Sequence, residues 1–274
     1  MRFTANNLAA AAALFAAVIA AAHAQQRAQT VSGAPLIQRF EADDEAHWWR
    51  TDDRTGGKKM NDTGFSASNI VIDKGEMTLT LAHEPYRDRG HTGASYKSRE
   101  LYHYGRFDAV MKAAHGTGVV SAFYTYTGPA FGDPHDEIDF EFLGRDPRLV
   151  HLNYFVSGEA QLKRTVELDF DASEDFHLYT IEWRPGEIVW SIDGEELHRV
   201  SGDPAEMPQH PGKIIADIWS AKGLKKWAGE QDPAVLPAQA HVRCMSWRPF
   251  GADAPTCADK MDAEEPGAGE GEGR

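Results

Sequence analysis

Three carboxylates and three large apolar side chains alternate in one short stretch of the chain. Glu137, Asp139 and Glu141 are each followed by one apolar residue within residues 137–142. Because side chains along a β-strand point alternately to its two faces, the carboxylates are expected on one face and the apolar row on the other. Like charges this close raise each other's pKa and destabilise a sheet. A strand that needed only a polar face would carry mixed charges or hydroxyls, so the pattern suggests selection for chemistry.

Cleavage of a glycosidic bond is the chemistry that such a row could perform. One carboxylate acts as nucleophile or base, and a second carboxyl group protonates the leaving oxygen. Glu137 and Glu141 are four residues apart, so an extended strand separates their Cα atoms by about 13 Å. Carboxyl groups stand about 5–5.5 Å apart in retaining and about 6.5–9.5 Å apart in inverting glycosidases, so the spacing selects neither outcome. Asp139 could orient the nucleophile or raise the pKa of a neighbouring Glu.

Two other interpretations of the acidic row stay open on these residues alone. The row could bind Ca²⁺, although one strand face rarely provides the six to eight oxygen ligands that Ca²⁺ takes, and no Asp-rich loop is adjacent. It could also be a solvated acidic surface.

Length and composition place the chain among globular proteins with an uncharged ligand. The 274 residues, 42% of them hydrophobic, suit one large all-β domain or two small ones. The net charge of −14 argues against nucleic acid as a partner, because phosphate binding needs clustered Lys and Arg. Seven Trp, eight Tyr and 13 Phe could pack in a core or provide platforms for sugar rings.

The N-terminus has the form of a secretory signal. Arg2 precedes the apolar run Leu8–Ala22, and residues 22–24 fit an A-x-A cleavage site. The alternative is a membrane anchor, but the run is short for a span of about 20 residues. We therefore expect a signal peptide over 1–24, a secreted or periplasmic protein, and no membrane partner after cleavage. The Gly- and Glu-rich residues 258–274 are predicted to be disordered, which leaves residues 25–257 for one domain.

Two cysteines, Cys244 and Cys257, are present. In an oxidising compartment they could form a disulfide, and the sequence leaves this open. Neither lies in a metal-binding spacing, and the chain has no C-x-x-C motif.

Short β-rich runs separated by Gly, Pro, Asn and Asp predict an all-β sandwich or barrel. Asp193-Gly194 lies between two such runs and predicts a tight hairpin. The expected strands include Asn69–Asp73, Met77–Ala82, Arg106–Lys112, Gly118–Tyr126, His151–Val156, Arg164–Phe170, His177–Trp183, Ile188–Ile192 and Lys213–Trp219.

The segment from Asp136 to Gly144 reads D-E-I-D-F-E-F-L-G, and it resembles the E-I-D-x-E-F active-site signature of glycoside hydrolase family 16. It is similar both to bacterial lichenases (endo-β-1,3-1,4-glucanases) and to plant xyloglucan endotransglucosylases. The resemblance covers about residues 36–250, and further matching segments are 119–129, 152–155, 170–177, 192–194 and 211–219.

This resemblance implies a β-jelly-roll sandwich of two antiparallel sheets with a concave substrate cleft. It implies an endo-acting, retaining β-1,3-1,4-glucanase that works by double displacement. By position, Glu137 matches the nucleophile, Asp139 the assisting carboxylate and Glu141 the general acid/base.

The resemblance also implies a set of substrate-binding positions. For each aromatic among them, plain core packing is the alternative, and His135 could contact the sugar or cap the strand. The expected substrate-binding residues are Tyr124, Tyr126, His135, Asn153, Trp219, Trp227 and Lys97. Trp183, Trp190 and Trp247 are expected in the core.

The chain departs from the lichenase pattern at five positions, one of which is His135, where lichenases often carry Trp. Ser95 stands in place of an acidic residue, Lys97 in place of Arg, and Asp217 in place of Asn. Arg243 stands where the family often has an Asp that binds structural calcium, so we expect no metal site and no cofactor.

These departures leave the physiological polymer open. A related hypothesis is that the protein depolymerises an acidic, succinoglycan-type bacterial exopolysaccharide. Binding such a polymer would require basic residues along the rim of the cleft. The lysines that could form this rim are Lys97, Lys222, Lys225 and Lys226. Two further functions on the same fold are a transglycosylase and a non-catalytic carbohydrate-binding lectin. In each case we expect a monomer whose partner is a β-glucan or related polysaccharide.

Overall fold

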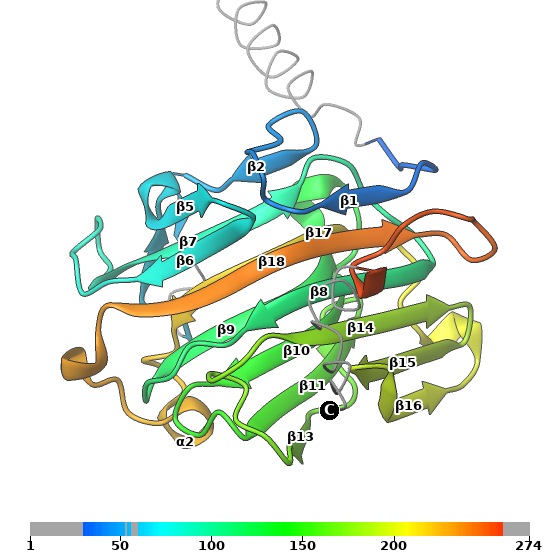
Figure 1. Ribbon diagram of the computed structural model, residues 1–274. Coiled ribbons are helices and arrows are strands. Elements are labelled where there is room, and N and C mark those ends of the chain that lie inside the picture. Colours follow the sequence, from blue (N-terminus) through cyan, green and yellow to red (C-terminus); the bar gives the residue numbers. More distant parts are fainter. Residues whose placement is uncertain (1–29, 53, 56–59, 260–274) are drawn as a thin grey trace, which may run out of the picture. The chain divides into compact units, whose positions relative to one another are not determined.

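The computed structural model describes residues 30–52, 54–55 and 60–259 (Figure 1). Residues from Val31 onward form one compact unit. The predicted signal peptide lies outside the described residues, as does all but the start of the predicted disordered tail. Within the described part, none of the helices has the length and apolar character needed to span a membrane.

The described residues of this unit form two β-sheets. The first sheet contains ten strands and carries the acidic row, and the second contains eight. In order across the first sheet the strands are β12 (Glu159–Ala160), β11 (Leu149–Val156), β10 (Asp136–Leu143), β9 (Val119–Thr127), β17 (Lys213–Ser220), β7 (His91–Ser98), β4 (Thr63–Phe65) and β3 (Arg54–Thr55), with β13 (Arg164–Glu167) beside β11 and β2 (Trp48–Arg50) beside β7.

Across the second sheet the order is β16 (Glu195–Ser201), β15 (Glu187–Ile192), β14 (His177–Arg184), β8 (Gly105–Lys112), β18 (Ala238–Arg248), β6 (Glu76–Leu81) and β5 (Ile70–Asp73), with β1 (Leu36–Gln38) beside β18. Among the strands of the described residues, pairing is antiparallel except between β4 and β7, which are parallel, and an isolated bridge between Val31 and Leu101 is also parallel. The short helix α2 (Lys225–Ala228) and the 3₁₀ turns Ala67–Asn69, Pro129–Phe131, Pro204–Glu206 and Pro233–Val235 lie in the connections. The prediction of an all-β sandwich is confirmed.

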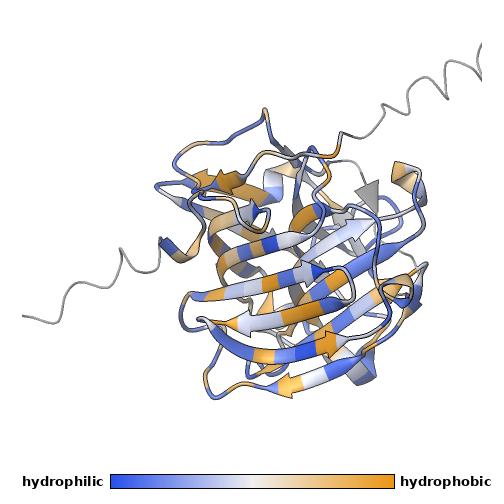
Figure 2. Ribbon diagram, turned by 90° about the vertical axis from the view of Figure 1, so that its right-hand side faces the viewer, coloured by the Kyte–Doolittle hydropathy of each residue, from blue (hydrophilic) through white to orange (hydrophobic). Residues whose placement is uncertain are grey.

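Apolar side chains from both sheets meet in one core. The rings of Phe140 and Phe142 on β10 lie 5.5 and 4.7 Å from the ring of Tyr179 on β14. Figure 2 shows hydrophobic and hydrophilic residues alternating along the strands, as expected where one face of a sheet is buried and the other is not. Trp183, Trp190 and Trp247 are buried as predicted. The apolar half of the acidic stretch therefore anchors β10 and turns its carboxylates outward.

The turn prediction at residues 193–194 is confirmed. Asp193 and Gly194 have φ values of 50° and 84° between β15 and β16, which is the left-handed conformation that a type I′ hairpin turn requires. Glycine adopts it without steric cost.

The predicted strand Arg164–Phe170 is too long, because β13 ends at Glu167. There the Leu168 amide donates to the Arg148 carbonyl, and the Phe170 ring stacks on His177 of the second sheet at 3.7 Å.

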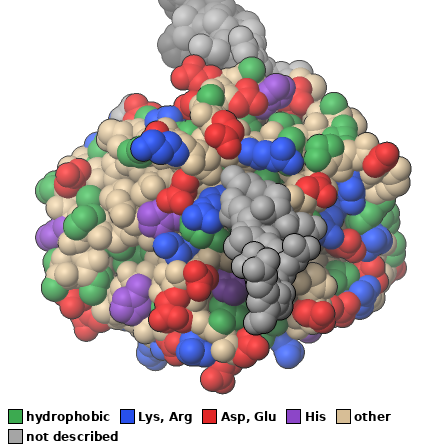
Figure 3. Space-filling model, in the orientation of Figure 1, with side chains coloured by type: hydrophobic (Ala, Val, Ile, Leu, Met, Phe, Trp, Pro, Cys, Tyr) green, Lys and Arg blue, Asp and Glu red, His purple; other side chains and the backbone are tan. Residues whose placement is uncertain are grey.

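A disulfide joins Cys244 and Cys257, which settles the alternative that the sequence left open. The bridge packs with Val110 and Leu178 of β8 and β14. Neighbouring residues of β8 belong to the core between the sheets, so the bridge lies on the outer face of the second sheet. Figure 3 shows basic and acidic side chains interspersed over the face of the molecule that is seen in Figure 1.

Candidate active site

The acidic row lies on the face of the first sheet that points away from the second sheet, called the open face below. Glu137 and Glu141 are partly exposed, whereas Asp139 is only 3% exposed. Their apolar neighbours on β10 are fully buried on the opposite face. The structure thus places the three predicted carboxylates together, in the alternation that the sequence indicates.

Strand register determines which side chains surround this row, because directly opposed residues of antiparallel strands point to the same face. On β9, Tyr126, Tyr124 and Ala122 oppose Glu137, Asp139 and Glu141. On β11, the corresponding residues are Phe155, Asn153 and His151. Farther along the open face, Asp217 of β17 opposes Ala122 of β9 and Ser95 of β7, while Lys97 opposes Ile215.

The open face holds carboxyl groups with raised pKa values. Burial, followed by the negative charges of Glu137 and Asp217, raises the pKa of Glu141 to about 8. Burial and the charges of Glu137 and Glu141 raise the pKa of Asp139 well above its usual range, and a hydrogen bond between the side chains of Asp139 and Glu137 adds to this. Burial raises the pKa of Asp217 to about 7. At neutral pH this cluster therefore holds protons next to Glu137, which suits a nucleophile beside an acid.

His135 contacts the acidic row directly. Its Nε2 lies 2.6 Å from Oε2 of Glu137, within hydrogen-bond distance of a carboxylate. The imidazole stacks on Phe155, with ring centroids 4.8 Å apart, and packs at a tilt against Tyr126 at 5.1 Å. His135 therefore orients one oxygen of Glu137, a role that differs from both the sugar contact and the strand cap expected from the sequence.

Tyr124 and Tyr126 of β9 have different surroundings on the open face. The Tyr124 hydroxyl donates to Oδ2 of Asp217 at 2.8 Å. The Tyr126 hydroxyl lies where a side chain at residue 128 would have to be, since a Cβ built on Gly128 would approach it to 2.6 Å. The glycine at 128 thus makes room for the Tyr126 ring.

Asn153 lies on the open face beside Asp139, but its amide oxygen is engaged with the protein. Oδ1 accepts hydrogen bonds from the backbone amides of Leu162 and Lys163 at 3.2 and 3.1 Å. Asn153 therefore anchors the segment between β12 and β13, and its contact with a substrate stays a prediction.

Trp219 and Trp227 lie at the other end of the open face from His135. Trp219 follows Asp217 by two residues on β17, and its ring stacks on Trp227 with centroids 6.2 Å apart. Both are partly exposed, and both pack on a small cluster that includes Val120 and Leu143. Both alternatives for these residues, sugar contact and packing, are thus compatible with where they lie.

Asp136 is a residue that the sequence analysis missed. Its carboxylate, 4% exposed, accepts hydrogen bonds from the Ser157 amide, the Gln209 amide, and both the amide and Nδ1 of His210. Burial acts to raise its pKa, but these hydrogen bonds bring the pKa below its ordinary value. Asp136 thus holds two distant loops at the start of β10. Nothing local in the sequence pairs residue 136 with residues 209–210.

The sequence analysis also missed three residues of the open face, Phe155, His151 and Lys213. The spacing of residues along the strands could have indicated them. Phe155 and His151 flank Asn153 at a spacing of two residues, which places all three on one face of β11. Lys213 opposes Tyr126 in the same way.

Two of the four lysines of the basic rim that an acidic polymer would need, Lys222 and Lys225, are paired with carboxylates. Lys222 lies 2.9 Å from Asp62, and Lys225 pairs with Glu230. Lys97 lies over the Trp49 ring, 5.1 Å from its centroid.

Among the described residues, no group of three or more His, Cys, Asp and Glu side chains is arranged to hold a metal ion. Arg243, at the position compared with a calcium-binding Asp, lies over the Phe176 ring at 3.8 Å and 3.4 Å from Glu76.

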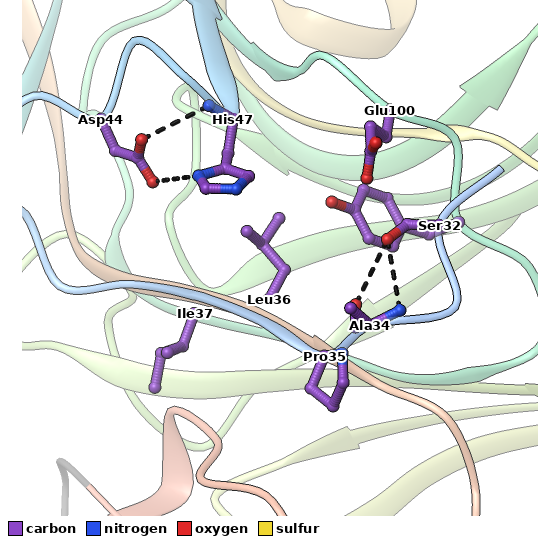
Figure 4. Close-up of a pocket in the computed structure, with 9 residues that line it drawn as sticks. Ser32, Ala34, Pro35, Leu36, Ile37, Asp44, His47 and Glu100 are labelled. Carbon is purple, nitrogen blue, oxygen red and sulfur yellow. Dashed lines mark hydrogen bonds and ion pairs between the residues drawn. The ribbon is translucent and has the colours of Figure 1, made fainter. Parts of the chain in front are cut away.

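A hollow of about 250 Å³ lies between β1 and the loops at residues 44–47 and 100–102 (Figure 4). Asp44 pairs with His47 in it, and the Ser32 hydroxyl bonds the backbone of Ala34. It contains none of the predicted site residues, so the open face remains the candidate site.

Two neighbouring carboxyl groups that can act as nucleophile and acid are what a glycoside hydrolase needs, and Glu137 and Glu141 on the open face provide such a pair. The family model described as Glycosyl hydrolases family 16 matches residues 57–237. A β-glucanase of Bacillus subtilis (strain 168) is 36% identical over 228 residues, which cover 82% of this chain and 88% of that protein. A β-glucanase of Acetivibrio thermocellus is 34% identical over 245 residues, covering 89% of this chain and 72% of that protein.

A crystal structure of a prokaryotic β-1,3-1,4-glucanase (lichenase) derived from a mouse hindgut metagenome superimposes with a TM-score of 0.75 at 35% identity, covering 79% of this chain and 100% of that one. The chain therefore belongs to glycosyl hydrolases family 16. It is an enzyme of the glycoside hydrolase class, which excludes the lectin alternative.

Proposed function

We propose that this protein is an endo-acting β-glucanase that hydrolyses β-1,3-1,4-linked glucan with retention of configuration. The observation that carries the proposal is the row Glu137, Asp139 and Glu141 on one strand face, in which the pKa of Glu141 is raised to about 8. An acid that keeps its proton at neutral pH beside a carboxylate that can attack is the pairing that a retaining glycosidase needs.

In the first step of the proposed reaction, a carboxylate oxygen of Glu137 attacks the anomeric carbon, and the bond to the leaving oxygen breaks. Glu141 gives its proton to that oxygen, so the departing chain leaves as an alcohol. In the second step, water attacks the anomeric carbon and its proton returns to Glu141, while the bond to Glu137 breaks. Asp139, which is hydrogen-bonded to Glu137, stabilises the charge on Glu137 as it returns.

The polymer is proposed to cross the open face, which would be the substrate cleft. Support comes from the aromatic side chains on both sides of the acidic row, Tyr126 and Phe155 at one end and Trp219 at the other. Aromatic faces pack well against the apolar faces of sugar rings, and a polymer bound across a sheet is cut internally. Tyr124, Asn153, Trp227 and Lys97 are proposed to complete the subsites.

The reaction as proposed uses no cofactor and no metal. We further propose that the enzyme acts as a secreted or periplasmic monomer, supported by the signal-like N-terminal sequence and by the disulfide, which belongs to oxidising compartments.

The test is a product-profile screen of the purified protein on lichenan, barley β-glucan, laminarin, xyloglucan and an acidic bacterial exopolysaccharide. Mixed-linkage glucan should give short oligosaccharides whose first-formed anomer, read by NMR, is β. A first-formed α-anomer would overturn retention, turnover of the exopolysaccharide alone would favour the depolymerase, and net transfer to a sugar acceptor would favour the transglycosylase.

The matched variant is Glu137→Gln, in which an amide of the same shape cannot attack. Turnover should fall by about 10⁴-fold or more while the protein stays folded. Near-full activity in a folded Glu137→Gln protein would refute the assignment of the nucleophile.

A further inference from the structure

Trp190 of β15 is a core residue that contacts the main chain of the acidic row from the buried side. Its side chain is fully buried, and its indole Nε1 donates a hydrogen bond to the carbonyl oxygen of Asp139, with an N···O distance of 3.0 Å. The bond crosses from the second sheet to the first and joins residues 51 positions apart in the chain. The second sheet is thus in direct polar contact with the middle residue of the row.

Other buried tryptophans show that packing alone does not produce such a bond. The indole nitrogen of Trp247 is buried and has no hydrogen-bond partner among the described residues. Trp183, on the neighbouring strand β14, donates to the carbonyl oxygen of Pro208, which lies in a loop, at 3.2 Å. An indole N–H can only donate, and in this core it is not always given an acceptor. The contact of Trp190 with the strand of the row is therefore a specific feature of its position.

This bond acts in a direction that strand pairing leaves free. Asp139 pairs with Tyr124 of β9 and Asn153 of β11, and the hydrogen bonds between strands lie in the plane of the sheet. The indole of Trp190 approaches from the second sheet, so its bond holds the Asp139 carbonyl along the normal of the first sheet. A carbonyl oxygen has two lone pairs and can accept this bond together with one from a neighbouring strand.

The depth of this peptide matters because of the side chain that it carries. The carboxyl group of Asp139 is on the open face, where it is hydrogen-bonded to Glu137 and close to the charge of Glu141. Like charges in the row repel each other, so a peptide that could shift would let the carboxyl groups separate. A displacement of about 1 Å at reacting groups can lower a rate by about 100-fold. The indole itself stacks on His198 of β16, with ring centroids 6.1 Å apart, which holds its orientation.

We propose that Trp190 is a positioning residue for glycan hydrolysis. Its indole N–H fixes the peptide of Asp139 and, through that peptide, the contact of the Asp139 carboxyl group with the proposed nucleophile Glu137. The inference rests on the proposed function and extends it to a residue of the second sheet. Trp190 contacts no substrate, because it lies on the buried side of β10. Loss of its hydrogen bond should therefore lower kcat and leave KM unchanged, whereas loss of a sugar contact would alter KM as well.

The first test compares Trp190→Phe with Trp247→Phe. Both substitutions remove the same atoms from a buried indole, but among the described residues only Trp190 of the two has an acceptor for its N–H. Both should lower the melting temperature. On barley β-glucan, well below both melting temperatures, kcat should fall by about tenfold or more in Trp190→Phe and by less than about twofold in Trp247→Phe, with KM unchanged. Equal kcat values in the two variants would overturn the proposal and leave Trp190 with a packing role.

A second variant removes the donor and keeps the shape of the ring. Benzothienylalanine in place of Trp190 has sulfur where the indole has N–H, so the core stays filled. Its kcat should fall as in Trp190→Phe, and the same replacement at Trp247 should leave kcat unaltered. Full kcat with benzothienylalanine at residue 190 would overturn the proposal even if Trp190→Phe does not fold. If the unaltered protein cleaves no glucan, the proposed function itself is wrong, which is a separate result from equal kcat values in variants of an active enzyme.

Discussion

Asp136 and Asp139 are two buried aspartates three residues apart on β10, and their pKa values are shifted in opposite directions. Asp136 accepts four hydrogen bonds from two loops, and its pKa lies below the ordinary value. Asp139, equally buried, faces Glu137 and Glu141, and its pKa lies well above it.

The difference teaches that burial alone does not decide the charge of a carboxyl group. Where backbone and imidazole donors converge, the ionised form is stabilised and the group serves the fold. Where other carboxyl groups converge, the protonated form is stabilised and the group can serve chemistry. Asp108 of the second sheet is also surrounded by donors, since Arg106, Thr180 and Ser246 donate hydrogen bonds to it.

Removing the structural aspartate should have the largest effect on stability. Asp136→Ala leaves buried amides of residues 157, 209 and 210 without their acceptor. We expect a loss of about 3 kcal/mol in the free energy of unfolding, or roughly 6–12 °C in melting temperature at pH 7. Because the folded pKa is lowered, this contribution is present above the unfolded pKa near 3.9 and is lost as pH falls through the folded value.

Thermal unfolding at pH 7 and at pH 3 measures both expectations, with Glu159→Gln as the surface control. A melting temperature of Asp136→Ala equal to that of the unaltered protein at pH 7 would contradict the assigned role.

The acidic row should behave in the opposite way. The pKa of Glu141 is about 8 in the folded protein and about 4.3 in an unfolded chain. The folded state therefore holds the extra proton, and stability is lost as pH rises from about 4 towards 8. Glu141→Gln removes the cost of ionising this buried carboxyl group. At pH 8 the free energy of unfolding of the variant should therefore be about 2 kcal/mol higher than that of the unaltered protein, with little difference at pH 4.

Urea unfolding at the two pH values provides the measurement. A Glu141→Gln protein that is less stable at pH 8 would show that the row is stabilising and would remove the contrast with Asp136. Activity should be lost in this variant at both pH values.

The smallest effect is expected at His135, whose imidazole contacts Glu137 of the acidic row. Loss of its hydrogen bond to Glu137 in His135→Ala should lower kcat by about tenfold, because such a bond to a charged group contributes roughly 1.5 kcal/mol.

His135→Gln, which keeps an N–H donor, and free imidazole added to His135→Ala should each restore part of the rate. Failure of both, with KM alone altered, would mean that His135 contacts substrate and does not position the nucleophile.

The sequence predicted what local spacing determines. The alternation around Glu137 predicted one acidic and one apolar face, and Asp193-Gly194 predicted its hairpin, because both depend on neighbours in the chain. The roles given to the carboxylates stay predictions that rest on the family resemblance.

What the sequence did not predict depends on which strands pair and in what register. The contact of Tyr124 with Asp217 joins residues 93 positions apart, and that of Asp136 with His210 joins residues 74 apart. Asn153 shows the same limit, since the family resemblance implied its position beside the acidic row but not the use of its amide oxygen by residues 162 and 163.

The disulfide between Cys244 and Cys257 has a practical consequence for presenting this enzyme to an insoluble polymer. It attaches the last described residues to the outer face of the second sheet, on the side of the sandwich opposite the acidic row. Asp259, the last described residue, therefore lies on the side of the enzyme that is opposite the open face. A surface linkage or a fused module attached after that residue would orient the open face towards the medium and leave it unobstructed.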